Sequence, residues 1–235
     1  MSVSKRSSTN SGVSDTGALA SAAASEFSSV SRPKQARSQR TLERLLDAAE
    51  QLILEQGVVD VSIPEIVARA GSSVGGFYGR FKDKDALIRA LEERFLARVG
   101  SMLADVTRPE KWEDKSLEQT VSGLLEVMVQ IYSDAGPLLR VFVAHAARSQ
   151  QVWRDGRRLR GQAIRHFIEL GLRHADQISH PEPAKALELG LQMVFGVLQQ
   201  KAILGDVRVQ QRALSNAELV GEFTSVILAY LQVRR

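Results

Sequence analysis

The sequence contains no cysteine. Disulfide bridges, thiolate zinc sites and cysteine nucleophiles are therefore excluded, and the chain suits a reducing compartment such as the cytoplasm. The four histidines are scattered and form no His-Glu-x-x-His or Glu-x-x-His motif, so we predict no metal site and no cofactor. A glycine-rich phosphate loop is missing too. A Ser-His-Asp set for acyl transfer is left open, but no nucleophile-elbow glycine pattern indicates one, and we predict that the chain is not an enzyme.

Long apolar runs are also missing. No stretch approaches the roughly 18 apolar residues that a membrane span requires. The alanine-rich stretch Ala18–Ala24 is interrupted by Ser21, is followed by Glu26 and has too little leucine or valine for a signal peptide. We therefore expect a cytoplasmic protein without a membrane anchor.

Positive charge is concentrated at one end of the chain. The net charge is +4, and the first 40 residues alone carry six basic and two acidic side chains. Such an excess is typical both of an arm that binds a polyanion and of a solubilising tail, and charge alone does not separate the two. Because residues 1–35 are rich in Ser, Ala, Gly and Thr and poor in large apolar side chains, we expect them to be disordered.

Helical periodicity begins at Thr41. Apolar residues then recur at spacings of three and four as far as Ile53, which predicts a helix with one buried face. Gly57 is placed to end this helix.

Two short helices are predicted next. Ser62 begins the pattern of a capping box and indicates a helix from Ile63 to Ala70. Gly71 interrupts this helix, and Ser73 can cap a second short helix that ends at Phe81. Two short helices joined by a glycine turn make a helix-turn-helix candidate.

The remainder of the chain shows only helical periodicity. Asp83 can cap a long amphipathic helix, and five more helical segments follow it: Leu117–Tyr132, Pro137–Gln150, Val152–His174, Ala184–Leu204 and Asn216–Val233. No strand pattern, internal repeat or sustained heptad appears. We predict an all-α protein with a helix-turn-helix domain at residues 36–82, its motif at about 62–81, and a larger helical-bundle domain at 83–235.

Residues 38–95 resemble the DNA-binding domain of the tetracycline-repressor (TetR) family of bacterial regulators. The resemblance rests on an ordered set of residues, which is more specific than any of its members. The set comprises Leu45-Leu46-Asp47-Ala48-Ala49, Gly57, Ser62, Ile66, Ala70-Gly71, Gly75, Phe77-Tyr78, Phe81, Lys84 and Leu87. Val67 and Ser72 depart from the family pattern, which usually has alanine and valine at these positions.

The resemblance implies a function for the chain. A member of this family is expected to bind a palindromic operator in double-stranded DNA as a homodimer, usually as a repressor. It is expected to release the operator when a small-molecule effector, here unknown, enters the C-terminal ligand-binding and dimerisation domain. Residues 100–235 match the family only in length and helical character.

A recognition helix places its N-terminal residues against base edges in the major groove. The residues so placed are Ser73, Val74, Gly75 and Gly76, with Gly79 and Arg80 one turn later. Arg80 is the one strong hydrogen-bonding reader among them, because Val74 offers only a thymine-methyl contact and the glycines have no side chain. We therefore expect sparse base readout, supplemented by DNA shape or by the basic arm.

Phosphate contacts are predicted at Arg40, Thr41, Ser62, Tyr78 and Lys84. Taken alone, Ser62 is explained as a helix cap and Tyr78 as a half-buried core aromatic. The whole motif favours the DNA role for Tyr78 and Lys84.

The last two helices are broadly apolar. Their apolar width exceeds one buried stripe, so we predict a dimer face there, although an ordinary core explains the pattern almost as well. The residues assigned to this face are Leu187, Leu191, Val194, Leu198, Leu219, Phe223, Val226 and Tyr230.

A ligand cavity is expected among the middle helices. Its candidate lining residues are Tyr132, Phe142, His145, Trp153, His166 and Met193. Each of them alone is more typical of a core or surface position. A cluster of basic residues beside Asp155 could attract an anionic ligand, but a solvated helix face is the simpler interpretation. The cluster comprises Arg154, Arg157, Arg158 and Arg160.

A non-specific architectural DNA-binding protein is the remaining alternative. It would use the basic arm and the dimer face. This interpretation is weaker, because the chain beyond residue 40 carries no net charge and proteins of that class are usually basic throughout.

Overall fold

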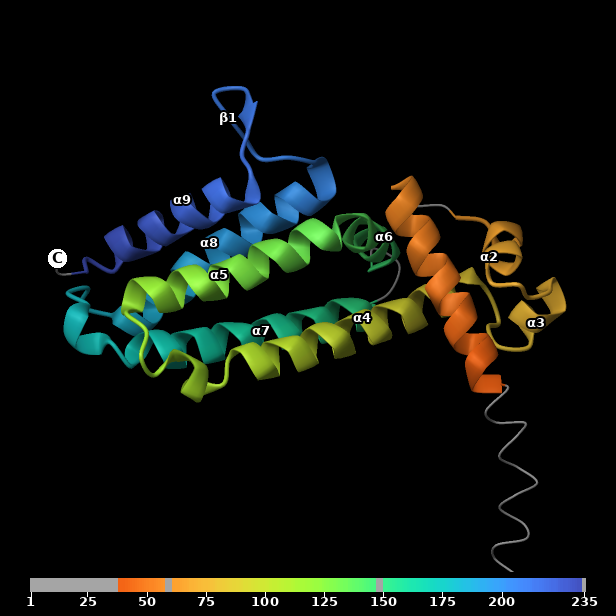
Figure 1. Cartoon of the computed structure of the whole chain (residues 1–235), viewed down its shortest axis with the longest axis horizontal. Helices are drawn as coiled ribbons and strands as arrows, with labels where there is room; N and C mark the ends of the chain where they lie inside the picture. The colour runs from red at the N-terminus through yellow and green to blue at the C-terminus, as the bar shows by residue number, and fades with distance from the viewer. Residues whose placement is uncertain (1–37, 58–60, 147–149, 234–235) are drawn as a thin grey trace, which may run out of the picture. The chain divides into compact units, whose positions relative to one another are not determined.

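The computed structural model describes residues 38–57, 61–146 and 150–233, and nearly all of its regular structure is helical (Figure 1). The backbone divides into two compact units, residues 1–43 and 44–235. Of the first unit only residues 38–43 are described. They are helical, and the Gln39 side chain donates a hydrogen bond of 2.7 Å to Glu43. The predicted disorder of residues 1–35 lies outside the described residues.

The first helix continues to residue 56. The apolar face that its periodicity predicts is buried, with Leu45 and Ile53 at its centre. Gly57 follows with φ at +64°, a conformation that costs glycine little, and its amide donates to the Ile53 carbonyl at 3.0 Å. The predicted end of this helix is confirmed.

Two short helices follow, α2 (Ile63–Arg69) and α3 (Val74–Tyr78). Ser62 caps α2 in the predicted capping box, and Gly71 turns the chain with φ at +55°. The helix α3 ends three residues before the predicted end at Phe81. Three glycines in and directly after α3 explain the difference, because glycine favours helix poorly.

Asp83 caps the long helix α4 (Lys84–Val106), and its carboxylate accepts from the Ala86 amide at 2.7 Å. The remaining helices are the 3-10 turn η1 (Pro109–Trp112), α5 (Leu117–Asp134), α6 (Gly136–Ala146), α7 (Gln150–Leu172), the 3-10 turn η2 (Ala175–Gln177), α8 (Pro183–Leu204) and α9 (Asn216–Tyr230). Each predicted long helix is present, with its ends shifted by a few residues. The all-α fold class is confirmed.

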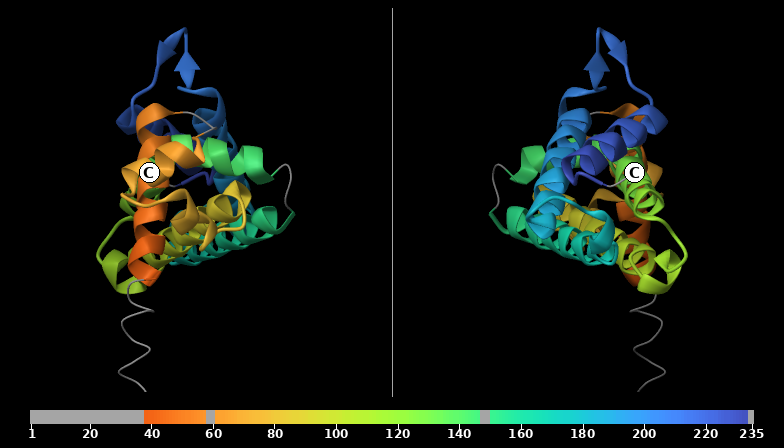
Figure 2. Two further views of the ribbon diagram at one scale, coloured as in Figure 1. Left: turned by 90° about the vertical axis from the view of Figure 1, so that its right-hand side faces the viewer. Right: turned by 90° about the vertical axis from the view of Figure 1, so that its left-hand side faces the viewer.

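One short hairpin departs from the prediction that the chain has no strand. The strands β1 (Arg208–Val209) and β2 (Arg212–Ala213) pair antiparallel and project from the helices (Figure 2). The turn residues Gln210 and Gln211 both have positive φ, at 48° and 65°. Asn-Gly or Asp-Gly usually marks such a turn, and two-residue strands are too short to show alternation, so no sequence signal predicts this hairpin.

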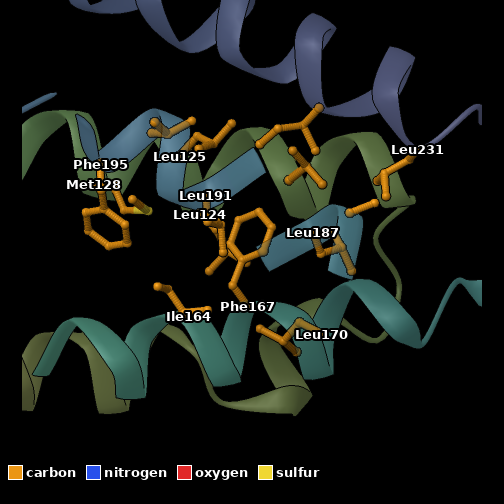
Figure 3. Close-up of a cluster of buried hydrophobic side chains, with 14 of the residues drawn as sticks. Leu124, Leu125, Met128, Ile164, Phe167, Leu170, Leu187, Leu191, Phe195 and Leu231 are labelled. Carbon is orange, nitrogen blue, oxygen red and sulfur yellow. The ribbon is translucent and has the colours of Figure 1, made fainter. Parts of the chain in front are cut away.

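The main core lies between α5, α7, α8 and α9. Figure 3 shows leucines and a methionine of α5 facing Leu187, Leu191 and Phe195 of α8, with Ile164 and Phe167 of α7 closing the cluster. The opposite side of α5 packs along α9, and α4 lies beside α7 (Figure 1). This core holds the middle helices at fixed spacing.

No single helix among residues 38–57, 61–146 and 150–233 has both the length and the apolarity to span a membrane. The consecutive helices α5 and α6 reach the required hydropathy only as a pair, which is bent by 71°.

Replacement of Leu187 tests the core. This side chain is fully buried, so Leu187→Ala should lower the free energy of unfolding by about 3 kcal/mol through lost burial and a residual cavity. The control Leu204→Ala, on the same helix but 78% exposed, should cost less than about 1 kcal/mol. Urea denaturation at one protein concentration measures both. Equal losses would contradict the assigned core.

Candidate functional site

The short helix α3 is fixed to its domain by one buried ring. Phe77 has no exposed surface, and its ring lies edge-on to Tyr78 at 5.3 Å and tilted against Phe81 at 5.5 Å. Aromatic contacts of this kind stabilise beyond the area they bury. The orientation of α3 is therefore set by packing rather than by its own weak helix propensity.

The outer surface of α3 is exposed. Val74 is 49% and Tyr78 is 55% exposed, and Ser73, Gly75 and Arg80 also lie at the surface. Val74 and Tyr78 are large exposed apolar and aromatic side chains for so small an element. The Arg80 guanidinium donates to the Gly79 carbonyl at 3.0 Å.

Gly76, assigned to base contact by the sequence, is partly covered by Ser72. A Cβ at Gly76 would lie 2.6 Å from the Ser72 Oγ, so the helix needs glycine here unless that hydroxyl moves. The close approach gives Gly76 a packing role that its sequence position does not reveal.

The hydroxyls of Ser62 and Ser73 are both engaged as helix caps. Ser73 Oγ accepts from the Gly76 amide at 3.0 Å, and Ser62 Oγ accepts from the Glu65 amide. The Ser62 hydroxyl and amide also donate to the Glu65 carboxylate, and these bonds lower the pKa of that carboxyl. Lys84, also assigned to phosphate, is half-buried at the start of α4.

Arg40 and Thr41 lie in the unit formed by residues 1–43. Arg40 is exposed and Thr41 is partly exposed on the first helix.

Ion pairs connect α4 to the first helix. Arg94 binds Asp47 at 2.6 Å and also Glu50, and Arg98 binds Glu50 at 2.7 Å. Burial alone would raise the pKa of Glu50, but the hydrogen bonds from Arg98 and Arg94 outweigh it and lower that pKa. The helix-turn-helix domain is thus joined to α4 by charged groups as well as by apolar packing.

Residues 45–91 match the family model described as bacterial regulatory proteins, tetR family. The matched segment covers the first helix from Leu45, both short helices and the first part of α4. The helix-turn-helix segment of the chain is therefore similar to that of tetR-family regulators.

Individual relatives agree with this similarity. The chain is 42% identical over 57 residues to the uncharacterized HTH-type transcriptional regulator YvdT of Bacillus subtilis, an alignment that covers 24% of this chain and 29% of YvdT. It is 33% identical over 102 residues to the HTH-type transcriptional regulator AcrR of Shigella flexneri, covering 43% of this chain and 45% of AcrR. The chain therefore spans less than half the length of these two curated relatives.

The fold of the chain also resembles solved structures. A Mesorhizobium loti protein assigned to the TetR family superposes with a TM-score of 0.65 at 21% identity, over 83% of this chain and 97% of the other. At this level of identity the similarity concerns the fold.

A cavity opens among the helices that follow the helix-turn-helix. It has a volume of about 230 Å³ and lies between α4, α6, α7 and α8, with Tyr132 of α5 on its wall. A second chamber of about 150 Å³ shares Phe95, Tyr132 and Arg160 with it and extends toward Phe195. The two chambers adjoin along these shared residues, the first with a partly polar wall and the second with an almost wholly apolar wall.

The structure brings two of the six predicted lining residues to this cavity, Tyr132 and Phe142. His145 is buried near Asp85, with 3.8 Å between Nε2 and Oδ1, and His166 contacts Thr107 at 3.3 Å. Met193 is 47% exposed on α8. Trp153 lies in α7, but its side chain falls outside the described residues.

Glu92, the acidic residue of the cavity wall, was not among the residues predicted from the sequence. A glutamate at this position falls on the buried stripe of α4, between Ile88 and Phe95 at spacings of four and three, and this interruption of an apolar face was the available signal. Arg157 and Arg160 line the same cavity, and Arg160 is half-buried, whereas Arg154, Arg157 and Arg158 of the predicted cluster are exposed.

Glu92 is 7% exposed and makes no hydrogen bond or ion pair with any described residue. Burial raises its pKa to about 7, and the charges of Asp155 and Glu93 add to the effect. A carboxyl group that lies in a cavity and has a strongly raised pKa is a frequent mark of a functional site.

A larger groove of about 580 Å³ lies on the other side of Phe95, between the first helix, α4 and α5. Two of its charged lining groups, Glu50 and Arg98, already bind each other. These two groups therefore satisfy each other, whereas the Glu92 carboxyl in the cavity has no such partner among the described residues. Within residues 38–57, 61–146 and 150–233, no group of three His, Asp or Glu side chains is placed to hold a metal ion.

The buried carboxyl makes stability depend on pH. The pKa of Glu92 is higher in the folded chain than its ordinary value of 4.5, so protonation favours folding, and its contribution is lost as the pH rises through about 7. Relative to Glu92→Gln, which stays neutral, the wild-type protein should lose about 2 to 3 kcal/mol of stability between about pH 5 and about pH 8.

Urea denaturation at several pH values measures this loss. The control Glu169→Gln removes an exposed carboxylate from α7, and its stability relative to wild type should stay nearly constant over the same range. A constant difference for Glu92→Gln as well would show that Glu92 ionises normally.

Proposed function

We propose that this chain is a sequence-specific transcriptional repressor of the TetR family that binds a palindromic DNA operator in the cytoplasm as a homodimer. A small molecule in the C-terminal cavity releases it from the operator. It needs no cofactor and is not an enzyme. The observation that carries the proposal is the exposed surface of α3, held rigid by the buried Phe77 ring.

The chemistry of α3 favours a particular mode of DNA recognition. Val74 can contact a thymine methyl, and Arg80 can donate two hydrogen bonds to guanine once it leaves the Gly79 carbonyl. Tyr78 and Lys84 would bind phosphate and fix the register. With a single strong base reader, much of the discrimination must come from DNA shape.

Selection of bound duplexes from a random DNA pool tests the proposal. Enrichment of a palindrome with two half-sites is the result expected of a dimeric regulator. Binding without enrichment would favour the architectural alternative. Absence of any binding would overturn the proposal.

Arg80→Ala then tests the readout. Loss of a bidentate contact to guanine should weaken binding to the selected operator by about 1 to 3 kcal/mol per half-site and leave non-specific binding nearly unchanged. Arg89→Ala, an exposed arginine on α4, is the matched control for lost charge. Titration of labelled duplexes at fixed salt measures both variants. An unchanged preference for the operator in Arg80→Ala would contradict the assigned role.

Exposed apolar residues on the last two helices support a dimer. Leu189 and Met193 of α8 are 44% and 47% exposed, and Val226 and Tyr230 of α9 are 53% and 36% exposed. The members of each pair are four residues apart and so share one helix face. The two helices are in contact through Gly190 and Ile227. Two copies of this helix pair would make a four-helix bundle.

The residues that the sequence assigned to the dimer face divide into two groups. Five of them have their side chains buried inside the subunit: Leu187, Leu191, Val194, Leu198 and Leu219. Phe223 is half-buried, and Val226 and Tyr230 are exposed. The proposed interface therefore uses Leu189, Met193, Val226 and Tyr230.

Val226→Glu tests this face. A carboxylate at the centre of an apolar interface is costly to bury, so the dimer dissociation constant should rise at least about tenfold. Met102→Glu places the same charge at a similarly exposed position on α4 and should leave the dimer unchanged. Sedimentation equilibrium measures both. A Val226→Glu protein as dimeric as the wild type would place the interface elsewhere.

The helix α4 offers a physical route for release. Glu92 and Phe95 line the cavity, while Arg94 and Arg98 on the same helix bind the first helix. A ligand that moves α4 would move these arginines with it, which would change the placement of the helix-turn-helix domain. Differential affinity of the ligand for the two arrangements would then drive release.

A further inference from the structure

We infer that the cavity binds an amphipathic organic monocarboxylate, whose carboxylate meets Arg160 and Arg157 and whose apolar body fills the chamber beside Phe195. This inference deepens the proposed function, because it rests on the cavity being the effector site. It specifies the chemical class of the effector, which the proposed membership of the TetR family leaves open.

Five polar side chains line the cavity and form no hydrogen bond or ion pair with any described residue: Glu92, Tyr132, Arg157, Arg160 and Gln199. Arg157 is exposed, whereas the other four are buried or half-buried, and shielded polar groups are normally satisfied in folded proteins. A ligand that carries hydrogen-bonding oxygens would satisfy several of them together.

The charge of the cavity favours an anion. Arg157 and Arg160 contribute two positive charges, and Glu92 is the one acidic side chain among the described residues of the wall. The pKa of Glu92 lies at about 7, because burial favours its neutral form. The lining is therefore net positive in either protonation state of Glu92. A protonated Glu92 can also donate a hydrogen bond to a carboxylate oxygen.

Arg160 is positioned to receive the acid group. Its guanidinium lies 5.7 Å from the centre of the Phe195 ring, which fixes it at the boundary between the two chambers. A guanidinium presents paired donors that match a carboxylate, and stacking on a ring leaves its edge open for them.

The apolar chamber sets the size of the ligand body. It has a volume of about 150 Å³ and a wall of aromatic and aliphatic side chains, apart from Tyr132 and Arg160. An apolar cavity of roughly this volume accommodates one benzene ring. The chamber thus fits a phenyl group or a short alkyl chain.

An organic cation is the competing ligand, because Glu92 could pair with it. To pair with the cation, Glu92 would have to ionise, which burial and the charges of Asp155 and Glu93 disfavour. The cation would also lie beside Arg157 and Arg160. The two ligand classes make opposite predictions for the same variants.

Calorimetric titration of the DNA-free protein with matched probes tests the inference. The probes are phenylbutyrate and octanoate, each beside its amide and its amine, so that only the head group changes. The carboxylates should bind at least about tenfold more tightly than the amides and amines. Arg160→Gln should remove this preference. Arg158→Gln, an exposed arginine on the same helix, should retain it.

Filling the cavity tests the location of binding independently. Gly156 lines both chambers, and a Cβ there would meet no atom within 4 Å. Gly156→Leu should therefore fold normally, as circular dichroism and thermal denaturation would show, while it excludes both carboxylates. Unchanged binding in a folded Gly156→Leu protein would overturn the inference.

The dependence on pH provides a further readout. The charged groups around Glu92 are Glu93 of its own helix and Asp155, Arg157 and Arg160 of α7, whereas the lining residues of α6 and α8 are uncharged. Ionised Glu92 repels the carboxylate, so wild-type binding should weaken between about pH 6 and about pH 8. Glu92→Gln should bind with an affinity that changes little over this range.

Three results would overturn the inference: preference for the amines together with loss of binding in Glu92→Gln, equal affinity for all head groups, or no carboxylate binding at about 1 mM. Addition of the probes to a preformed complex with the selected operator then separates the two proposals. Carboxylate binding without DNA release would preserve the inference and overturn the proposed effector response. Release of DNA by the amines alone would preserve the proposed effector response and overturn the inference.

Discussion

The pairing of Arg94 with Asp47 and Glu50 connects the two candidate sites of this protein, the helix-turn-helix and the cavity beside α4. It joins α4 to the first helix at a contact where the Arg94 and Glu50 side chains are 24% and 15% exposed, while Asp47 is 58% exposed. The Arg94–Glu50 pair is therefore largely shielded from water, and removal of one partner from such a pair is costly. Any movement of α4 along its axis must therefore carry the first helix with it or break these bonds.

Because α4 is one continuous helix, neighbouring residues on it face different parts of the molecule. Glu92 points into the cavity, and Arg94, two residues later, binds the first helix. Positions two apart on a helix are separated by roughly 200° around its axis. The same continuous helix thus presents one side to the cavity and another to the first helix, with no break between them.

The core formed by α5, α7, α8 and α9 gives α4 a fixed partner. Because α5 is packed on α9 and its leucines interlock with α7 and α8, the cavity wall opposite α4 is held by buried apolar contacts. A cavity wall fixed in this way would reduce the entropy cost of ordering side chains if a ligand binds there.

Local sequence patterns predicted the helical fold, the helix-turn-helix motif and the resemblance to the TetR family. These features depend on contacts between residues a few positions apart, such as the Ser62 cap, the Gly71 turn and the periodic apolar face of the first helix. Only the tertiary structure decided which apolar residues of α8 are core and which are exposed, since Leu187 and Leu189 differ in direction rather than in chemistry. It also decided that Glu92, Tyr132 and Arg160, from three separate helices, meet at one cavity. Proximity of residues from separate helices depends on long-range packing and gives no signal in a local sequence pattern.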